Sequence, residues 1–119
     1  MKVEFEANTI TYETNVEEEC YMIGFSDNGD DPDEYVIIER AITFDKQDIE
    51  LGMNTYYFEY SDQSGYGICE NVRIETNKVI FDLKKNTLDD IESIEITFEQ
   101  EKSIEDWNEF KNVFDKIFA

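Results

Sequence analysis

The stretch that most constrains the fold is residues 55–74, TYYFEYSDQSGYGICENVRI, in which two alternating segments flank a polar break. The first segment places aromatic side chains at every second position, which is the period of a β-strand. The break contains glycine and small polar residues, which are typical of turns. The sequence therefore predicts two strands joined by a turn at residues 62–65, with Tyr66, which stands between two glycines, at an exposed point.

Two further segments are apolar at consecutive positions. Residues 20–25 read CYMIGF and residues 35–38 read YVII. Such runs are typical of strands whose two faces are both covered. The segment between them, residues 26–34, is strongly acidic and contains the single proline of the chain. We expect these strands and their loop to form a hairpin in the middle of a sheet.

The rest of the chain predicts more strands and a C-terminal helix. Apolar residues recur three and four positions apart over residues 103–118, which is typical of an amphipathic helix, and Ser103 with Asp106 resembles a capping pair. The predicted fold class is α+β: a mainly antiparallel β-sheet with the C-terminal helix packed on one face. The other predicted elements are a strand over residues 3–12, a short helix over residues 45–52, a hairpin of residues 72–74 with 79–83 around Thr76 and Asn77, and a strand over residues 94–98.

The charge limits the possible partners. The 119 residues, which we expect to form a single domain over residues 1–119, include 30 acidic and 10 basic residues, for a net charge of −20. This charge disfavours binding to nucleic acid or to an anionic membrane surface, and it accelerates association with a basic protein. It also keeps a protein soluble without any partner. No apolar run resembles a signal peptide or a membrane span, so we expect a cytoplasmic location.

The residue types argue against catalysis. Histidine is absent, which removes the commonest general base and metal ligand. The two cysteines, Cys20 and Cys69, are expected to be small reduced core residues. No glycine loop has the spacing that binds phosphate. We therefore expect no enzymatic activity and no cofactor.

The acidic loop is the first candidate site. Its carboxylates are the ligands that calcium prefers. However, when Asp27 is taken as the first position of an EF-hand, Pro32 occupies the position of the required glycine and Ile38 that of the required glutamate. A weak calcium-binding module remains an alternative.

The same loop also suits protein binding. Carboxylates beside tyrosines can form charge-assisted hydrogen bonds and cation–π contacts with Arg and Lys of a basic partner. This hypothesis requires the acidic loop of residues 26–34 and the turn at residues 62–65 to lie at the same end of the sheet. The candidate partner-binding residues are Asp27, Asp30, Asp31, Asp33, Glu34, Tyr35, Asp62, Gln63 and Tyr66.

Several short motifs occur in a fixed order along the chain. They are Gly24-Phe25-Ser26-Asp27, Asp30-Asp31-Pro32 followed by Tyr35, Phe44-Asp45, Gln47-Asp48, Gly52, Tyr57, Asp62-Gln63 and Gly65-Tyr66-Gly67. This succession resembles the immunity protein 10 family, whose members are encoded beside bacterial polymorphic toxins and bind the cognate toxin. The resemblance implies a noncatalytic α+β inhibitor, and it carries no toxin-contacting positions over to this sequence.

The leading hypothesis is therefore an immunity protein that binds and neutralises a cognate, basic toxin domain. The alternatives are an acidic nucleic-acid mimic or adaptor that binds basic proteins generally, and the weak calcium module. The sequence leaves the oligomeric state open between monomer and homodimer, because apolar atoms of Val36, Ile38 or Tyr57 could be covered by a second copy.

Overall fold

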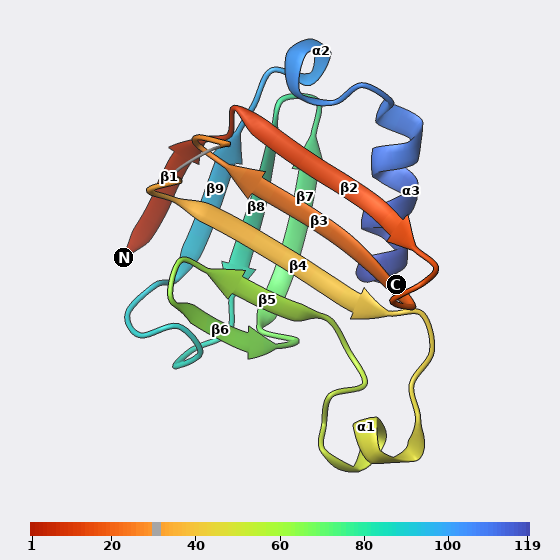
Figure 1. Ribbon diagram of the computed structural model, residues 1–119. Helices are drawn as coiled ribbons and strands as arrows, with labels where there is room; N and C mark the ends of the chain where they lie inside the picture. The colour runs from red at the N-terminus through yellow and green to blue at the C-terminus, as the bar shows by residue number, and fades with distance from the viewer. Residues whose placement is uncertain (30–31) are drawn as a thin grey trace.

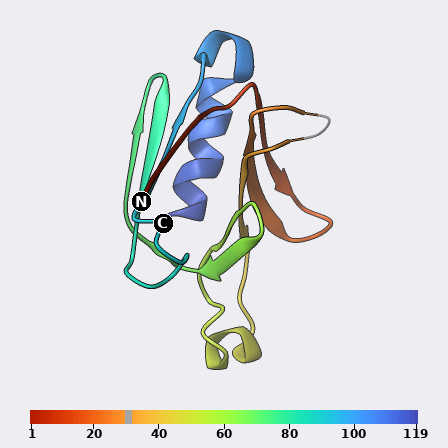
Figure 2. The same cartoon turned by 90° about the vertical axis from the view of Figure 1, so that its left-hand side faces the viewer.

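The computed structural model describes residues 1–29 and 32–119, and its strands form two sheets packed face to face (Figures 1 and 2). One sheet has four strands in the order β1-β9-β8-β7, and the other has five in the order β2-β3-β4-β5-β6. The strands are β1 (Lys2–Glu6), β2 (Thr9–Asn15), β3 (Cys20–Ser26), β4 (Tyr35–Ala41), β5 (Tyr57–Tyr60), β6 (Gln63–Tyr66), β7 (Cys69–Glu75), β8 (Lys78–Leu83) and β9 (Ser93–Thr97).

The chain changes sheets twice. It leaves the four-stranded sheet after β1, builds the five-stranded sheet, and returns at Gly67 to add β7, β8 and β9. All neighbouring strands are antiparallel except β1 and β9, which are parallel. The prediction of mainly antiparallel strands with a C-terminal helix is thus confirmed, but the prediction of a single sheet was wrong, because the strands form two sheets. The predicted strand over residues 3–12 is two strands in different sheets, divided at Ala7 and Asn8.

The core lies between the two sheets. Phe81 on β8 packs edge-on against Phe25 on β3 and Phe58 on β5, with ring centroids 6.3 and 5.2 Å apart. All three rings are at most 1% exposed. One continuous cluster of buried side chains therefore joins both sheets to the C-terminal helix.

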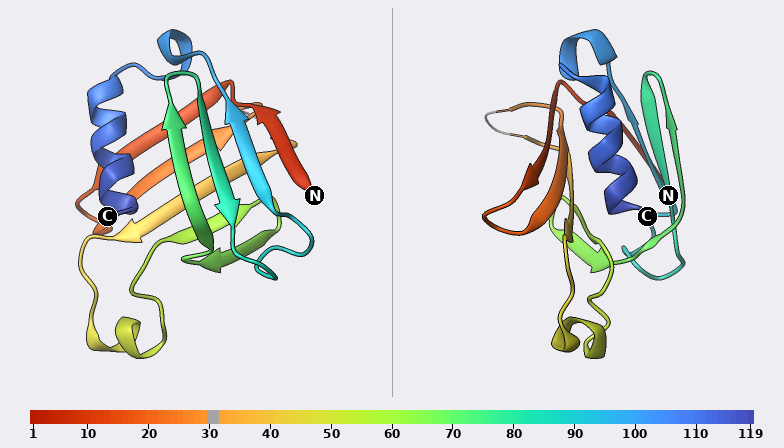
Figure 3. Two further views of the ribbon diagram at one scale, coloured as in Figure 1. Left: turned by 180° about the vertical axis from the view of Figure 1, so that it is seen from behind. Right: turned by 90° about the vertical axis from the view of Figure 1, so that its right-hand side faces the viewer.

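The C-terminal helix α3 (Trp107–Ile117) lies between the sheets along one side, as the side views in Figures 2 and 3 show. Its apolar stripe faces the core, because Phe110, Val113 and Ile117 are fully buried. Of the predicted capping pair, only Asp106 caps α3. Asp106 is the N-cap and accepts a hydrogen bond from the backbone N–H of Glu109 at 3.1 Å. Ser103 instead ends a separate short helix, α2 (Gln100–Ser103).

The stretch of residues 55–74 does not form the predicted hairpin. β5 pairs with β6 around a two-residue turn at Ser61 and Asp62, and β7 belongs to the other sheet. Residues 63–65, which were assigned to a turn, are in a strand. Gly65 is required there for packing, since a Cβ at this position would lie 2.7 Å from Cγ2 of Ile68. Gly67, with a φ of 58°, allows the change of sheet.

Strands β3 and β4 do form the central hairpin that the sequence predicted, but only one of their faces is covered. Ile23 and Ile38 are fully buried against the core, whereas Met22 and Ile37 point to the opposite face and are only partly buried. The expectation that Val36 and Ile38 expose apolar atoms was wrong, because both are 0% exposed. On the outer face of β4, Ile37 is the large aliphatic side chain that is only partly buried.

Local signals away from the core were more accurate. The short helix α1 (Lys46–Glu50) has a capping box in which Asp45 and Asp48 each accept a backbone hydrogen bond from the other. Thr76 and Asn77 form the two-residue turn between β7 and β8. Both cysteines are free thiols. Among the helices that the structure describes, none combines the length and the apolar character needed to span a membrane.

Candidate functional site

Two acidic segments meet at one end of the five-stranded sheet. The β3–β4 loop leads into β4 at Tyr35, and the β5–β6 turn lies directly beside it, because the backbone N–H of Ser61 donates to the carbonyl of Tyr35 at 3.2 Å. The hydroxyl of Tyr60 also donates to Oε1 of Glu34 at 3.1 Å. The predicted proximity of the acidic loop and Asp62 is therefore present in the structure.

The described part of the acidic loop is held by hydrogen bonds at its base. The N–H of Asp27 donates to the carbonyl of Glu34, and the N–H of Asp33 donates to Oδ1 of Asp27, both at 3.1 Å. The side-chain amide of Asn8 donates to the carbonyl of Asp27 at 2.9 Å. These contacts fix where the loop leaves and rejoins the sheet. The candidate residues Asp30 and Asp31 lie outside the described residues.

A carboxylate clamped by two tyrosines lies next to this loop. The hydroxyl of Tyr35 donates to Oε2 of Glu59 at 2.7 Å, and that of Tyr57 donates to Oε1 at 2.6 Å. The Tyr35 hydroxyl is also close to the carbonyl of Ser61. The hydrogen bond to Glu59 is the main reason why the pKa of each hydroxyl is raised above the ordinary tyrosine value. The clamp therefore orders a negative charge and two aromatic rings on one face of the sheet.

Tyr66 does not belong to this end of the sheet. It pairs with Tyr57 at the far end of the β5–β6 ladder, three residue positions, or about 10 Å, from the Tyr60–Gln63 pair beside the turn. Its side chain is 43% exposed and packs edge-on against Tyr57, with ring centroids 5.5 Å apart. The idea that Tyr66 joins the acidic loop was wrong, because Gln63 to Tyr66 form a strand and not a turn.

Glu59 and Tyr57 are residues that the sequence reasoning missed as a site. The alternation had placed both on one face of β5, which was a usable signal. The alternation could not show that Ile37 pairs with Glu59. This pairing brings Tyr35 of the neighbouring strand within reach of the Glu59 carboxylate. That register depends on strand pairing across 20 residues or more and is not visible in either segment alone.

The acidic end has no cationic partner within the described part of the chain. Each ion pair in the described part of the chain joins a Lys or Arg residue to an acidic residue outside this end of the sheet. Asp33 and Asp62 are exposed, and Glu34 is partly buried. In residues 1–29 and 32–119, no group of three or more potential ligand residues is arranged to hold a metal ion. The arrangement suits charge-assisted hydrogen bonds to Arg or Lys of another protein.

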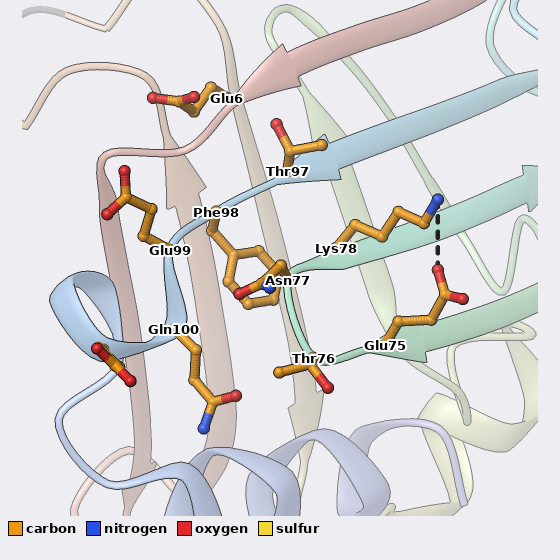
Figure 4. Close-up of a pocket in the computed structure, with 10 residues that line it drawn as sticks. Glu6, Glu75, Thr76, Asn77, Lys78, Thr97, Phe98, Glu99 and Gln100 are labelled. Atoms are coloured by element: carbon orange, nitrogen blue, oxygen red, sulfur yellow. Dashed lines mark ion pairs between the residues drawn. The ribbon is translucent and has the colours of Figure 1, made fainter.

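A large hollow of the surface lies elsewhere, between the β7–β8 turn, the end of β9 and α2 (Figure 4). Its volume is about 870 Å³, and its lining includes Glu6, Glu75 and Glu99. Lys78 pairs with Glu75 at 3.4 Å at its edge. The hollow contains none of the candidate residues, and the side chains in Figure 4 point in different directions without converging on one point. We therefore assign it no role.

Comparison with models of known protein families gives a match that covers most of the chain. The model of a protein family described as Immunity protein 10 matches residues 6–106. This range includes every strand of the five-stranded sheet and the acidic loop, and it ends at the N-cap of α3. No match was found among curated proteins.

Proposed function

Because the chain belongs to the immunity protein 10 family, we propose that it neutralises a cognate bacterial toxin of a polymorphic toxin system by binding it in the cytoplasm, without catalysis. A protein of this kind needs a stable surface that matches one partner. It needs no reactive group, and the chain contains no histidine. The toxin domain that it binds is proposed to be basic.

The observation that supports a basic partner is the acidic end of the five-stranded sheet. Two segments that are distant in sequence bring Asp33, Glu34 and Asp62 together next to ordered tyrosines. Unpaired carboxylates at a protein surface accelerate the encounter with a positive partner and select against a negative one. We propose that Asp27, Asp30, Asp31, Asp33, Glu34, Tyr35, Asp62 and Gln63 contribute to this encounter.

The function is tested by co-expression with the toxin domain encoded next to this chain. Cells that express the toxin domain alone should stop growing, and cells that also express the chain should grow. The purified proteins should form a complex of fixed stoichiometry in sedimentation velocity. Continued growth arrest in the presence of the folded chain, together with no complex, would contradict the proposal.

The acidic end is tested by its effect on association. The triple variant Asp33→Asn/Glu34→Gln/Asp62→Asn should associate about tenfold more slowly in low salt and should show a weaker dependence on salt. The control Glu105→Gln/Glu109→Gln/Asp115→Asn removes the same charge from the region of α3 and should change the rate less. Equal rates for the two variants would mean that net charge, and not this end, determines association.

The salt dependence of binding, with protamine as a competing basic protein, separates a specific inhibitor from a general binder of basic proteins. A cognate partner should remain bound in physiological salt. A general acidic mimic should bind protamine as tightly as it binds the toxin domain, and should release both at moderate salt.

A further inference from the structure

Figure 1 looks directly onto the outer face of the five-stranded sheet, and no other described element lies in front of it. The strand register arranges its side chains in four rows that run across the strands. The rows are Asn15, Cys20 and Ala41; Glu13, Met22, Glu39, Tyr57 and Tyr66; Thr11, Gly24, Ile37, Glu59 and Ser64; and Thr9, Ser26 and Tyr35. We call this surface the row face.

The centre of the row face is more apolar than a solvated sheet face requires. Met22 and Ile37 lie on the two central strands and are only partly buried. Tyr57 and Tyr66 add an aromatic pair beside them. Strands that are apolar on both faces are usual where both faces are covered. Within residues 1–29 and 32–119, only the inner face of this sheet is covered by other elements of the chain.

The row face also has a recess that could hold a side chain. It lies over Gly24, between Thr11 and Ile37, and Tyr35 and Pro32 contribute to its lining. Its volume is about 250 Å³. A Cβ at Gly24 would lie 2.8 Å from Oγ1 of Thr11, so glycine keeps this part of the surface hollow. Large side chains set in such pockets provide much of the affinity of protein interfaces.

The charge on the row face indicates what could cover it. Glu13, Glu39 and Glu59 project from it, and the five strands of this sheet contain one basic residue, Arg40. Arg40 faces the other way, because its Nη1 donates to the carbonyls of Ile117 and Ala119 at the C-terminus. A second copy of the chain would bring the same carboxylates together, and like charges across an interface are unfavourable.

We infer that the row face is the surface on which the cognate toxin domain docks, through a basic patch with an apolar or aromatic side chain at its centre that enters the recess over Gly24. This inference rests on the proposed function and goes beyond it, since it moves the main contact from the acidic loop to the sheet. The acidic end then lies at the edge of the interface and acts mainly on the association rate, whereas the row face determines the dissociation rate.

The test uses two variants of the row face and one matched control, with the toxin domain encoded next to this chain as the ligand. Ile37→Arg places a positive charge at the centre of the face and should weaken binding about 100-fold or more. Tyr66→Ala should weaken it about tenfold, mainly by faster dissociation. Thr97→Arg adds the same charge to the outer face of the other sheet, at an exposed position, and should change affinity less than about threefold.

Each outcome decides a separate point. If the wild-type chain does not bind the toxin domain, the proposed function fails and the inference fails with it. If it binds and both row-face variants bind as Thr97→Arg does, the function stands and the row face is not the docking surface. If sedimentation shows a wild-type dimer that Ile37→Arg dissociates, a second copy occupies the face and the inference is wrong. Should Ile37→Arg lose its cooperative thermal unfolding, Tyr66→Ala and Met22→Ala decide alone.

Discussion

The two outer faces of the molecule differ in how their charges are balanced. On the four-stranded sheet, seen in the left view of Figure 3, Lys2 lies 3.1 Å from Glu4, and Arg73 lies 3.6 Å from Asp82. On the row face, Glu59 is bound by tyrosine hydroxyls instead of a cation. The first face forms ion pairs within the chain, whereas the carboxylates of the second face form none within the described residues.

The difference shows that net charge alone is a poor guide to a binding surface. The charge of −20 is a property of the whole chain, and it would suit many surfaces. What distinguishes the row face is the combination of carboxylates without a cationic partner, a partly buried apolar centre and a recess. A face covered with exposed ion pairs gains little from them in stability and offers a partner no apolar area.

The two outer faces belong to sheets that share one core, so they should unfold together. The variant Phe81→Ala tests this and has the largest expected effect on the free energy of unfolding. Phe81 contacts Phe25, Phe58 and Phe118, so its loss should lower the free energy of unfolding by about 3–5 kcal/mol. Denaturation would be followed by circular dichroism and by Trp107 fluorescence, with exposed Tyr66→Ala as the control. Two separate transitions, in place of a single one at lower denaturant, would contradict a shared core.

A smaller effect on the free energy of unfolding distinguishes a carboxylate bound by tyrosines from one paired with a lysine. Glu59→Gln should lower the free energy of unfolding by about 1 kcal/mol, because it weakens the charge-assisted hydrogen bonds from Tyr35 and Tyr57. Glu95→Gln on the other face removes an ion pair with Lys2 at 3.9 Å and should cost less than about 0.5 kcal/mol. Urea denaturation of both variants measures the contrast. Equal losses would mean that the tyrosine clamp has no special stability.

The sequence predicted the local parts of this architecture well. The capping box of α1, the turn at residues 76–77 and the amphipathic stripe of α3 each depend on residues close together in the chain, and each was identified. The two-sided apolar pattern of β3 and β4 correctly indicated central strands. It also indicated that both faces of these strands are covered. Because the described residues cover only the inner face, the pattern supports a partner on the outer face.

What the sequence could not predict depends on pairing between distant segments. The parallel pairing of β1 with β9 joins positions about 90 residues apart, and it places β1 in a different sheet from β2. The glycines at residues 65 and 67 are compatible with a turn, and only the contact of Gly65 with Ile68 shows that the first serves packing. The Tyr35–Glu59–Tyr57 clamp escaped notice for the same reason.

The pH dependence of the two tyrosines sharpens the comparison further. Because their pKa values are raised in the folded state, Tyr35 and Tyr57 stabilise the fold fully below the ordinary tyrosine pKa of 10, and this contribution is lost as the pH rises through the folded values. In Glu59→Gln both pKa values should move back toward 10, since Glu59 is the main cause of the shift. Ultraviolet titration of the folded protein measures this. An unchanged titration curve would place the cause of the shift elsewhere.

The smallest expected effect is on the four-stranded face. Arg73→Gln removes the pair with Asp82, in which the side chains are 58% and 37% exposed, so it should lower the free energy of unfolding by less than about 0.5 kcal/mol. The difference from wild type should disappear in 0.5 M salt, because exposed pairs are screened. Binding of the toxin domain should be unchanged, since this face is turned away from the row face. A loss above about 1 kcal/mol that persists in salt would show that these pairs are structural, and a loss of binding would place the partner on this face.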